Sequence, residues 1–460
     1  MKKVLIISYY FPPCNLTPSE RIYSWAKYLK ALGYYPIIVT RNWDIEIKGF
    51  EDELKTSGTS PLHKVYDDYE VWYMPYKQSF KEYLYFKKSS SLIKLLYLLV
   101  SFKINFLQIF TNRFSNFYFL YRKAAQLIES DKGIKKIIVS AYPYLLFNYA
   151  YKLNKKYKIP WIADYRDDWT SNEILNKSKI HSILNKLNSY NEKKWLSSAY
   201  CFTTVSDFYI QKIQRVIGPV KGVCIENGYM KENYLTLENV ELYEDFTVTY
   251  VGSLYRTQPI ELFLEGVLKF IELNKPEKFK VLFVGLLTNT EAMERLKKYT
   301  ELFPKYFTFT SRISKQEAIA MQYKSAMLLL CTHTNMKGTP GSKLYEYIAL
   351  KKRVLITPGD GDIVENTLQK TGQGIVASTS EEVVSILEKE YSAYFNMGTK
   401  NEYINEEAIK KYDRFYQTKI LADILNEEYD NKGEDSYNCT QFNFFNYIFR
   451  KLKLKLTIVI

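Results

Sequence analysis

The sequence predicts an α/β protein built from two doubly wound, Rossmann-like domains. The first observation is that short apolar runs alternate with longer amphipathic stretches along most of the 460 residues. The second is that this alternation stops in the acidic, less regular residues 231–245 and then starts again. The third is that charged and glycine-rich motifs come just after the apolar runs, where ligands bind in such folds.

The first half of the chain follows a strand–helix–strand order. The predicted strands are residues 2–10, 35–40, 135–141, 159–166, 200–206 and 222–227, and the predicted helices are residues 20–33, 145–157 and 186–199. Gly33 stands where the first helix should end, because glycine readily takes the left-handed conformation of a helix C-cap. Strands connected by helices in this order form a parallel sheet with helices on both faces.

The second half repeats this order after the acidic stretch. Its predicted strands are residues 246–253, 279–285, 307–313, 327–333 and 353–357, and its predicted helices are residues 259–273, 290–303, 315–326, 342–351, 381–395 and 406–429. The predicted organisation is an N-terminal domain over 1–228, a linker over 229–245, a C-terminal domain over 246–408, a helix over 409–428 able to cross back to the first domain, and a tail over 429–460. Two such domains are expected to face each other, with the carboxyl ends of both sheets around one cleft.

The composition excludes several classes of protein. With 47% hydrophobic residues the chain can bury a large core, which excludes an intrinsically disordered protein. The five cysteines are scattered, so neither a disulfide scaffold nor a structural zinc site is predicted, and a reducing compartment fits best. The first loop lacks GxGxxG, and there is no Walker lysine motif, which argues against a dinucleotide-binding oxidoreductase and a phosphate-loop NTPase.

The charge balance favours anionic partners. The chain has 64 basic and 50 acidic residues, a net charge of +14, which suits nucleotides, phospholipid surfaces or nucleic acid. No signal peptide or spanning helix is predicted. Residues 77–123 and the basic, apolar residues 442–460 are typical of segments that lie on an anionic membrane surface. The alternative is an ordinary core helix in the first segment and a frayed tail in the second.

The strongest candidate site lies in residues 331–357. A strand ends near Cys331, a Gly/Pro loop follows, and a helix begins at Ser342 or Lys343. The free amides and dipole of a helix N-terminus bind anions, and a lysine adds a charge suited to phosphate. Glu346, one turn on, could accept the two hydroxyls of a ribose. This pattern indicates a nucleoside diphosphate site, although a surface Lys–Glu pair would give the same spacing.

Three further clusters are weaker candidates. Gly252 and Ser253 end a strand in a tight turn, and Arg256 follows, able to reach a diphosphate. Charged residues also crowd the end of the buried strand 159–166, where they need a partner or a function, and an internal Asp–Arg salt bridge is the structural alternative. This cluster consists of Asp164, Arg166, Asp167 and Asp168. Arg21, at the start of the first helix, could touch a ligand phosphate, and His333 is the histidine nearest the main loop.

Residues 1–428 resemble a bacterial family 4 glycosyltransferase of the GT-B fold, in the branch that builds capsule, O-antigen or exopolysaccharide. The resemblance rests on KVLIISYYFPP…ER, PWIADYRDDW, ENGY, YVGSLYRTQP and GTPGSKLYEYIAL, of which the last is the most specific. It implies retaining transfer of a sugar from a nucleotide-sugar donor, without a metal or other cofactor. It also implies a lipid-linked saccharide acceptor at the cytoplasmic face of the membrane, and no nucleic-acid partner.

The resemblance also implies roles for individual residues. Lys343 would bind the donor diphosphate, Glu346 the ribose, and the backbone around Gly341, Ser342 and Leu344 the distal phosphate. From the residues themselves, Gly252, Ser253 and Arg256 complete the donor side, where Lys343 and Arg256 would stabilise the charge of the departing diphosphate. The acceptor side would be formed by Arg21, Arg166 and Asp167, and Asp164 would accept the proton. The chain departs from the family pattern where the first of two paired glutamates falls on Gly338, and where an Arg and a Lys fall on Ser253 and Gln258.

Two other functions are open at this point. One is an enzyme of the same fold that hydrolyses or epimerises its nucleotide sugar; it would need acid–base groups near the sugar, and His333 is the candidate found. The other is a non-catalytic basic protein that binds nucleic acid or anionic membranes. The basic residues of 77–123 are mostly lysines among leucines, which favours lipid over nucleic acid.

Overall fold

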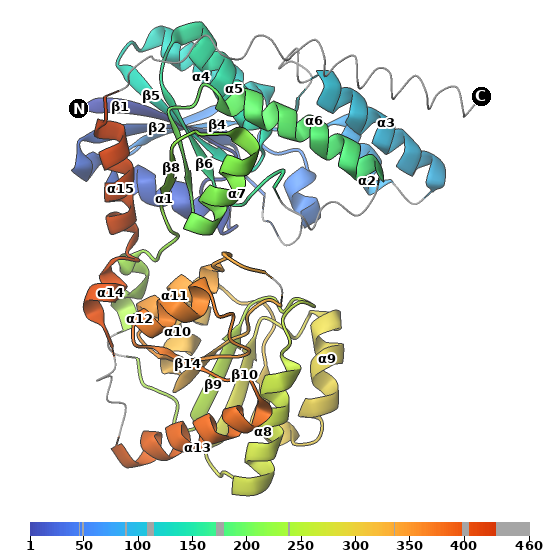
Figure 1. The fold of residues 1–460 in the computed structure, drawn as a ribbon, viewed down its shortest axis with the longest axis vertical. Coiled ribbons are helices and arrows are strands. Elements are labelled where there is room, and N and C mark those ends of the chain that lie inside the picture. Colours follow the sequence, from blue (N-terminus) through green and yellow to red (C-terminus); the bar gives the residue numbers. More distant parts are fainter. Residues whose placement is uncertain are drawn as a thin grey trace. The chain divides into compact units, whose positions relative to one another are not determined.

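A computed structural model describes residues 1–45, 47, 50–87, 90–107, 115–171, 179–237, 240–334, 336–397 and 404–428. These residues form an α/β fold with two sheets, as the sequence predicts (Figure 1). The first sheet has eight strands and the second six, against the six and five predicted strands. Residues 1–425 make up one compact unit. The predicted membrane-binding tail, 429–460, lies outside the described residues.

The first sheet has the strand order β3-β4-β2-β1-β5-β6-β7-β8. Its strands are β1 (Lys2–Ser8), β2 (Tyr34–Arg41), β3 (Leu62–Val65), β4 (Glu70–Met74), β5 (Ile134–Ala141), β6 (Trp161–Tyr165), β7 (Cys201–Thr204) and β8 (Gly222–Cys224). All neighbours pair in parallel except β3, which runs antiparallel to β4. The β3–β4 hairpin is an addition that the strand pattern did not predict.

Helices cover both faces of this sheet because its strands are buried on both sides. In β1, Leu5 and Ile7 pack on one face and Val4 and Ile6 on the other. The first face carries α4 (Tyr118–Ser130), α5 (Leu145–Tyr157), α7 (Asp207–Ile217) and the end of α6 (Lys179–Leu196). The second carries α1 (Pro18–Tyr28) and α15 (Arg414–Asn426), so the last described helix belongs to the core of the first sheet.

The predicted single helix 406–429 is two helices, α14 (Glu406–Lys410) and α15, which corrects the prediction. Between them the chain pairs with the linker: the Tyr229 N–H donates to Tyr412 O at 3.0 Å, and the Arg414 N–H donates to Tyr229 O at 2.9 Å. These backbone bonds replace helical ones. Beyond the break, Leu421 of α15 packs in the same buried cluster as Trp25 of α1.

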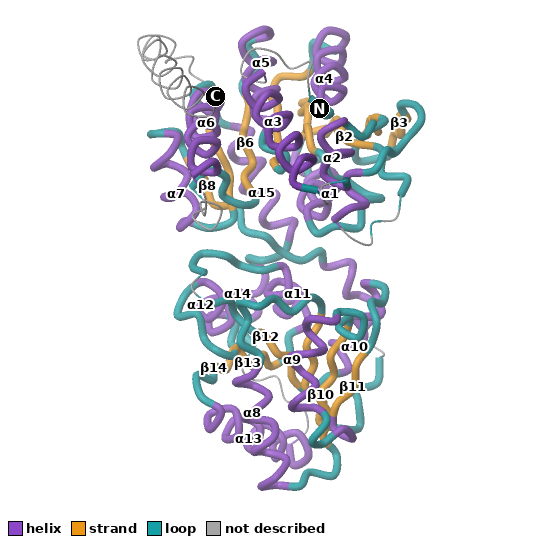
Figure 2. Tube along the Cα trace, turned by 90° about the vertical axis from the view of Figure 1, so that its right-hand side faces the viewer, coloured by secondary structure: helices purple, strands orange, loops and turns teal. Residues whose placement is uncertain are grey.

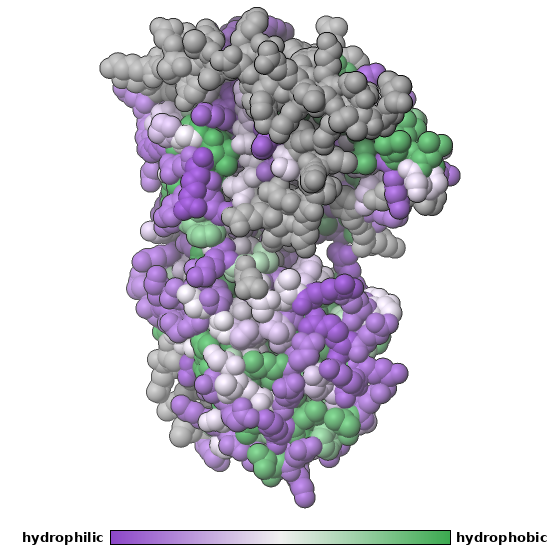
Figure 3. Space-filling model, turned by 45° about the vertical axis from the view of Figure 1, so that its right-hand side comes forward, coloured by the Kyte–Doolittle hydropathy of each residue, from purple (hydrophilic) through white to green (hydrophobic). Residues whose placement is uncertain are grey.

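The described residues of the segment 77–123 contain a short helix, a longer one of 17 residues, and the start of α4. The first two are α2 (Phe80–Phe86) and α3 (Ser91–Leu107). In α4, Leu120 is fully buried, so this part of the segment is an ordinary core helix. α3 differs because it exposes leucines to solvent; Leu92 is 76% exposed. Hydrophobic residues form a patch in the upper right of Figure 3, where α2 and α3 stand. Within the described ranges no helix is long and apolar enough to cross a bilayer.

The second sheet is entirely parallel, with the order β11-β10-β9-β12-β13-β14. Its strands are β9 (Phe246–Val251), β10 (Phe279–Val284), β11 (Phe307–Phe309), β12 (Met327–Leu330), β13 (Arg353–Ile356) and β14 (Gly374–Val376). One face packs on α8 (Glu261–Asn274), α9 (Thr290–Thr300) and α13 (Ser380–Met397). The other packs on α10 (Lys315–Lys324), α11 (Ser342–Leu350), α12 (Ile363–Lys370) and α14 (Figure 2).

Short 3₁₀ helices complete the described elements: η1 (Lys30–Leu32), η2 (Phe50–Leu54), η4 (Lys231–Leu237) and η5 (Pro304–Tyr306). The strand order determines where ligands are expected. In the second sheet β9 lies between β10 and β12, so the order reverses there and the loops after β9 and β12 separate. A crevice forms at such a switch point at the carboxyl ends of the strands. Gly252 follows β9, and the loop 331–341 follows β12.

Candidate functional site

The start of α11 has the features of an anion site. The helix begins at Ser342, and its N-cap, Gly341, has no side chain to accept a hydrogen bond from the first-turn amides. Gly341 is exposed, and no atom lies within 4 Å of where a Cβ would stand. The Leu344 N–H donates to Gly341 O at 3.2 Å, whereas no described group accepts from the Ser342 or Lys343 N–H. These two amides therefore lie beside open space at the positive end of the dipole of this nine-residue helix.

The sequence-predicted Lys343 lies beside Gly252, as expected. Its ammonium donates to the Tyr250 hydroxyl at 2.8 Å and to the Ser253 carbonyl at 3.1 Å. A Cβ on Gly252, whose φ is +85°, would lie 3.2 Å from Lys343 Cε, so a glycine gives the lysine room. No described carboxylate forms an ion pair with Lys343, and burial lowers the pKa of its ammonium to about 8.

Tyr250 is a site residue that the sequence analysis missed. Its buried ring lies 4.0 Å from the Lys343 ammonium, and its hydroxyl donates to Ser253 O at 2.7 Å. In the sequence it is one aromatic residue among several in an apolar strand, so no local signal separates it from the core. The tyrosine holds both the lysine and the turn after β9 in place.

The turn after β9 is held by Gln258, the position on which the family's lysine falls, and by Arg295. Gln258 is buried; its amide donates to Cys331 O at 2.7 Å, and its oxygen accepts from Tyr255 N–H at 3.0 Å. Arg295, which the sequence analysis also missed, donates to Tyr255 O at 3.0 Å and to Gln258 O at 2.7 Å. In this structure the Gln258 side chain therefore links the turn after β9 to the end of β12.

Arg256 and His333 stand at the edge of this group. The Arg256 guanidinium is 84% exposed and forms an ion pair with Glu291. The structure therefore does not bring Arg256 to Lys343, because the start of α9 holds it. His333 Nδ1 lies 2.7 Å from the Thr257 hydroxyl, and burial together with the Lys343 charge lowers the pKa of its imidazole.

Glu346 lies one turn along α11 from Lys343 and lines a small cavity of about 20 Å³. No described group donates a hydrogen bond to its half-buried carboxylate, and burial raises its pKa. Arg414 lines the same cavity, is 4% exposed, and has an unpaired Nε among the described residues. The ion pair of Lys315 with Glu20 also borders it. An unpartnered carboxylate beside an arginine can accept hydroxyls from a ligand.

The loop before α11 contacts the first sheet's helices. Gly338 O accepts from the Ser206 hydroxyl at 2.9 Å, and the Thr339 and Tyr209 hydroxyls are 3.0 Å apart. The Gly338 N–H donates to Asp362. A Cβ on Gly338 would stand 2.3 Å from a Phe208 ring carbon, and its φ is +67°. The family's glutamate could not occupy this position without displacing Phe208.

The Asp164 and Arg21 placements correct two predicted roles. Both side chains are buried, 0% and 1% exposed, and they form an ion pair at 2.9 Å. Asp164 also accepts from the hydroxyls of Ser140 and Thr203, at 2.7 and 2.8 Å. Arg21 further donates to Ile225 O at 2.8 Å. Because these groups satisfy each other inside the core, we assign them a structural role; neither reaches an acceptor.

The loop after β6 places Arg166, Asp167 and Asp168 in three different environments. Arg166 is half-buried and donates to Ala141 O at 3.0 Å, beside the ring of Tyr10. Asp167 is exposed, as an acceptor-side residue must be. Asp168 is buried and pairs with Lys212 at 2.8 Å, so it stabilises the loop.

Glu192 of α6 is a buried carboxyl beside this loop that the sequence analysis missed. It accepts from Tyr165 OH at 2.9 Å and from the Thr170 N–H and hydroxyl. Burial raises its pKa to about 7, against the opposing effect of these donors. It thereby ties α6 to both ends of the loop that carries Arg166 and Asp167.

We expect Glu192 to make the protein less stable as the pH rises. Between about pH 4.5 and 7 the folded protein keeps a proton that the unfolded chain has lost, so stability falls over this range, by on the order of 3 kcal/mol. Glu192→Gln should remove this slope. Calorimetric melting from pH 5 to 8 should show the wild type losing stability relative to the variant; parallel curves would contradict the prediction.

Comparisons with known proteins address the fold. No protein-family model matches the chain, and no curated protein matches it significantly by sequence. Among the solved structures that match, three that cover nearly the whole chain are given as examples. One is a glycosyltransferase from Rickettsia africae, with 14% identity and a TM-score of 0.58 over 93% of this chain and 99% of that one. Another is an alpha,alpha-trehalose-phosphate synthase (UDP-forming) from Burkholderia vietnamiensis, with 11% identity and a TM-score of 0.57 over 93% of this chain and 100% of that one. The third is the E. coli trehalose-6-phosphate protein bound with UDP-2-fluoro glucose, with 11% identity and a TM-score of 0.58 over 93% of this chain and 99% of that one. The chain therefore has the GT-B fold.

Proposed function

We propose that this protein is a glycosyltransferase that takes its sugar from a nucleoside-diphosphate sugar. The observation that carries the proposal is the half-buried Lys343 ammonium, which has no acidic partner among the described residues and lies at the open N-terminus of α11. The full charge of the lysine and the partial positive charge of the helix end, about half an elementary charge, suit a diphosphate. Solved structures of the same fold include a UDP-forming synthase and one bound with UDP-2-fluoro glucose.

The proposed roles follow from the positions of the groups. Lys343 and the amide of Ser342 would contact the diphosphate and stabilise the negative charge that it gains as the sugar leaves. The Leu344 amide would join them by giving up its hydrogen bond to Gly341 O, at 3.2 Å. Glu346 would accept both ribose hydroxyls. The proposed reaction retains the sugar's configuration, with the acceptor hydroxyl attacking from the side that the diphosphate leaves, and it requires no metal because cationic groups supply the charge.

The proposed acceptor is a lipid-linked saccharide at the inner face of the cytoplasmic membrane, in bacterial surface polysaccharide synthesis. The net charge of +14 and the exposed leucines of α3 support contact with an anionic membrane. Arg166 and Asp167 remain the acceptor-side residues, since they lie after β6 and are not buried in the core. The acceptor and the pathway rest on the family resemblance.

Titration with nucleoside diphosphates tests the donor site. One of UDP, GDP, ADP, CDP or dTDP at about 100 times its dissociation constant should raise the free energy of unfolding by about 2.7 kcal/mol. Its affinity should fall about tenfold per pH unit above pH 8, since binding then requires Lys343 to take up a proton. Calorimetric titration at pH 7, 8 and 9, with and without EDTA, measures both effects. If no nucleotide bound, the proposed donor site would be refuted. If EDTA abolished the binding of the nucleotide, the proposal that the site needs no metal would be refuted.

A further inference from the structure

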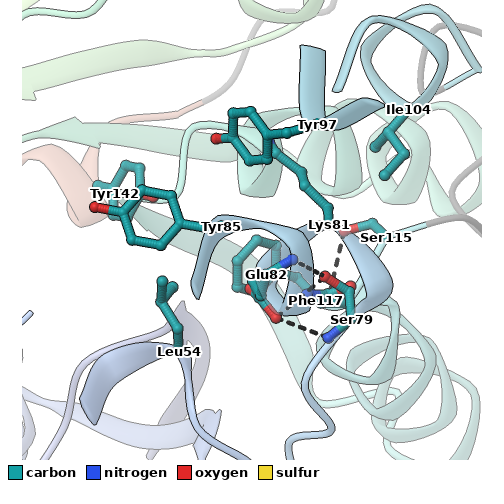
Figure 4. A pocket seen from close by; sticks show the side chains of 11 residues that line it. Leu54, Ser79, Lys81, Glu82, Tyr85, Tyr97, Ile104, Ser115, Phe117 and Tyr142 are labelled. Atoms are coloured by element: carbon teal, nitrogen blue, oxygen red, sulfur yellow. Dashed lines mark hydrogen bonds between the residues drawn. The ribbon is translucent and has the colours of Figure 1, made fainter. Parts of the chain in front are cut away.

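A second cavity lies in the first sheet's half of the chain, between α2, α3 and the end of β5. Its volume is about 180 Å³. Eleven residues line it: Leu54, Ser79, Lys81, Glu82, Tyr85, Tyr97, Ile104, Ser115, Asn116, Phe117 and Tyr142. Figure 4 shows Lys81 extending from α2 toward Tyr97 of α3, with Tyr85 and Tyr142 to one side. The lining is therefore hydroxyl-rich around one ammonium group.

The Lys81 ammonium has no ionic partner among the described residues. Its neighbour Glu82 is used elsewhere: the carboxylate closes the α2 capping box with Ser79, accepting from Ser79 N–H at 2.8 Å, and it also accepts from Tyr76 OH. The ammonium lies 6.0 Å from the centroid of the Tyr97 ring. Partial burial lowers the pKa of Lys81. A half-buried, unpaired cation is unfavourable unless an anion joins it.

The surface beside this cavity is apolar and basic. Five leucines of α3 are exposed: Leu92, Leu95, Leu96, Leu98 and Leu99. Residues 77–107 contain six lysines and one acid, Glu82. Large exposed apolar patches mark interaction sites, and lysines among leucines suit the interface of an anionic lipid layer. The charge excludes a cationic partner and favours an amphiphile with an anionic head.

The cavity also adjoins the predicted acceptor side. Tyr142, which lines it, directly follows β5. The preceding residue, Ala141, accepts from Arg166 at 3.0 Å. A ligand that fills the cavity therefore lies at the carboxyl edge of the first sheet, next to the loop that carries Arg166 and Asp167.

We propose that this cavity binds the phosphate group of an amphiphilic acceptor through Lys81 and the surrounding hydroxyls, while the acceptor's hydrocarbon chain lies along the exposed leucines of α3. This inference deepens the proposed function and rests on it for the identification of the ligand as an acceptor. It assigns to α2 and α3 a binding role separate from the donor site at Lys343.

Calorimetric titration of the full chain with dodecyl phosphate, below its micelle concentration, tests the proposal. Lys81→Met keeps the length of the side chain and removes the charge, and it should weaken binding at least tenfold, as expected for losing a charged hydrogen bond. Lys77→Met, an exposed lysine in the same segment, is the matched control and should bind like the wild type. Both variants keep the basic tail, so the tail cannot produce the difference.

Three further titrations identify the ligand's parts. The double variant Leu95→Ser, Leu99→Ser should also bind dodecyl phosphate more weakly than the wild type does. Dodecyl maltoside and inorganic phosphate should bind the wild type far more weakly than dodecyl phosphate does. Equal binding by Lys81→Met and the wild type, or dodecyl maltoside binding as well as dodecyl phosphate, would overturn the anion site. If inorganic phosphate bound as well as dodecyl phosphate, the cavity would be a site for free phosphate, and the proposal of an amphiphilic ligand would be wrong. UDP titrations report on the donor site separately, and all variants should leave them unchanged.

Discussion

Replacing Lys343 by methionine is expected to lower kcat/KM for sugar transfer by about 100- to 1,000-fold, that is, by about 2.7–4 kcal/mol of transition-state stabilisation. The reason is that Lys343 lies in the first turn of α11 with no acidic partner among the described residues, while Arg256 forms an ion pair with Glu291. The charge that develops on the departing diphosphate would then meet only the helix dipole. Steady-state kinetics with the nucleotide sugar identified by titration would measure the loss.

The control for this experiment is Lys351→Met at the other end of the same helix. Lys351 is paired with Glu406 at 2.6 Å, away from the amides of the first turn. This variant should keep wild-type kinetics. Lys343→Met should fold as well as the wild type, because it removes a charge whose burial is unfavourable. A Lys343→Met enzyme with unchanged kcat/KM would exclude the lysine from the donor site.

Asp164→Asn is expected to destabilise the protein by about 3–5 kcal/mol without changing the chemistry of the molecules that remain folded. The change leaves Arg21 charged, buried and without its partner, since both side chains lie inside the core. If Asp164 were the proton acceptor, kcat would instead fall by about 10²–10⁴-fold at little cost in stability. Calorimetric melting and kcat, measured on the same preparations, separate the two outcomes.

Two matched variants make this experiment sharper. The double variant Asp164→Leu with Arg21→Met removes both charges, so it should recover part of the stability that the single change loses. Asp167→Asn, three residues along and exposed, should leave stability unchanged. If the double variant melted no higher than Asp164→Asn, the buried ion pair would not be the cause of the loss.

Local sequence patterns were enough to locate the centre of the candidate donor site. The apolar strand that ends near Cys331, the Gly/Pro loop and the amphipathic stretch after it predict β12 and α11, and so place Lys343 at a helix start. Gly252 was found in the same way, as a glycine directly after a strand. Both inferences need only short-range information, because periodicity and turn chemistry act over a few residues.

Long-range partners could not be predicted in this way. Asp164 and Arg166 are close in sequence, which suggested an Asp–Arg pair between them, yet the partner of Asp164 is Arg21, 143 residues away. Tyr250 meets Lys343 across 93 residues for the same reason. Whether two charged side chains meet depends on strand order, and a single sequence does not show that order.

The amino-acid pattern alone established the α/β class, the repeat of the strand–helix order after residues 231–245, and a nucleotide-site candidate after a strand of the second sheet. These follow from hydrophobic periodicity, which is local. The tertiary structure assigned Asp164 and Arg21 to the core and broke the last helix near Asp413, where the chain pairs with Tyr229. It also placed Lys81 in a cavity without an ionic partner among the described residues, beside the exposed leucines of α3. Those outcomes depend on packing between distant segments, because burial and the choice of partner are properties of the assembled core.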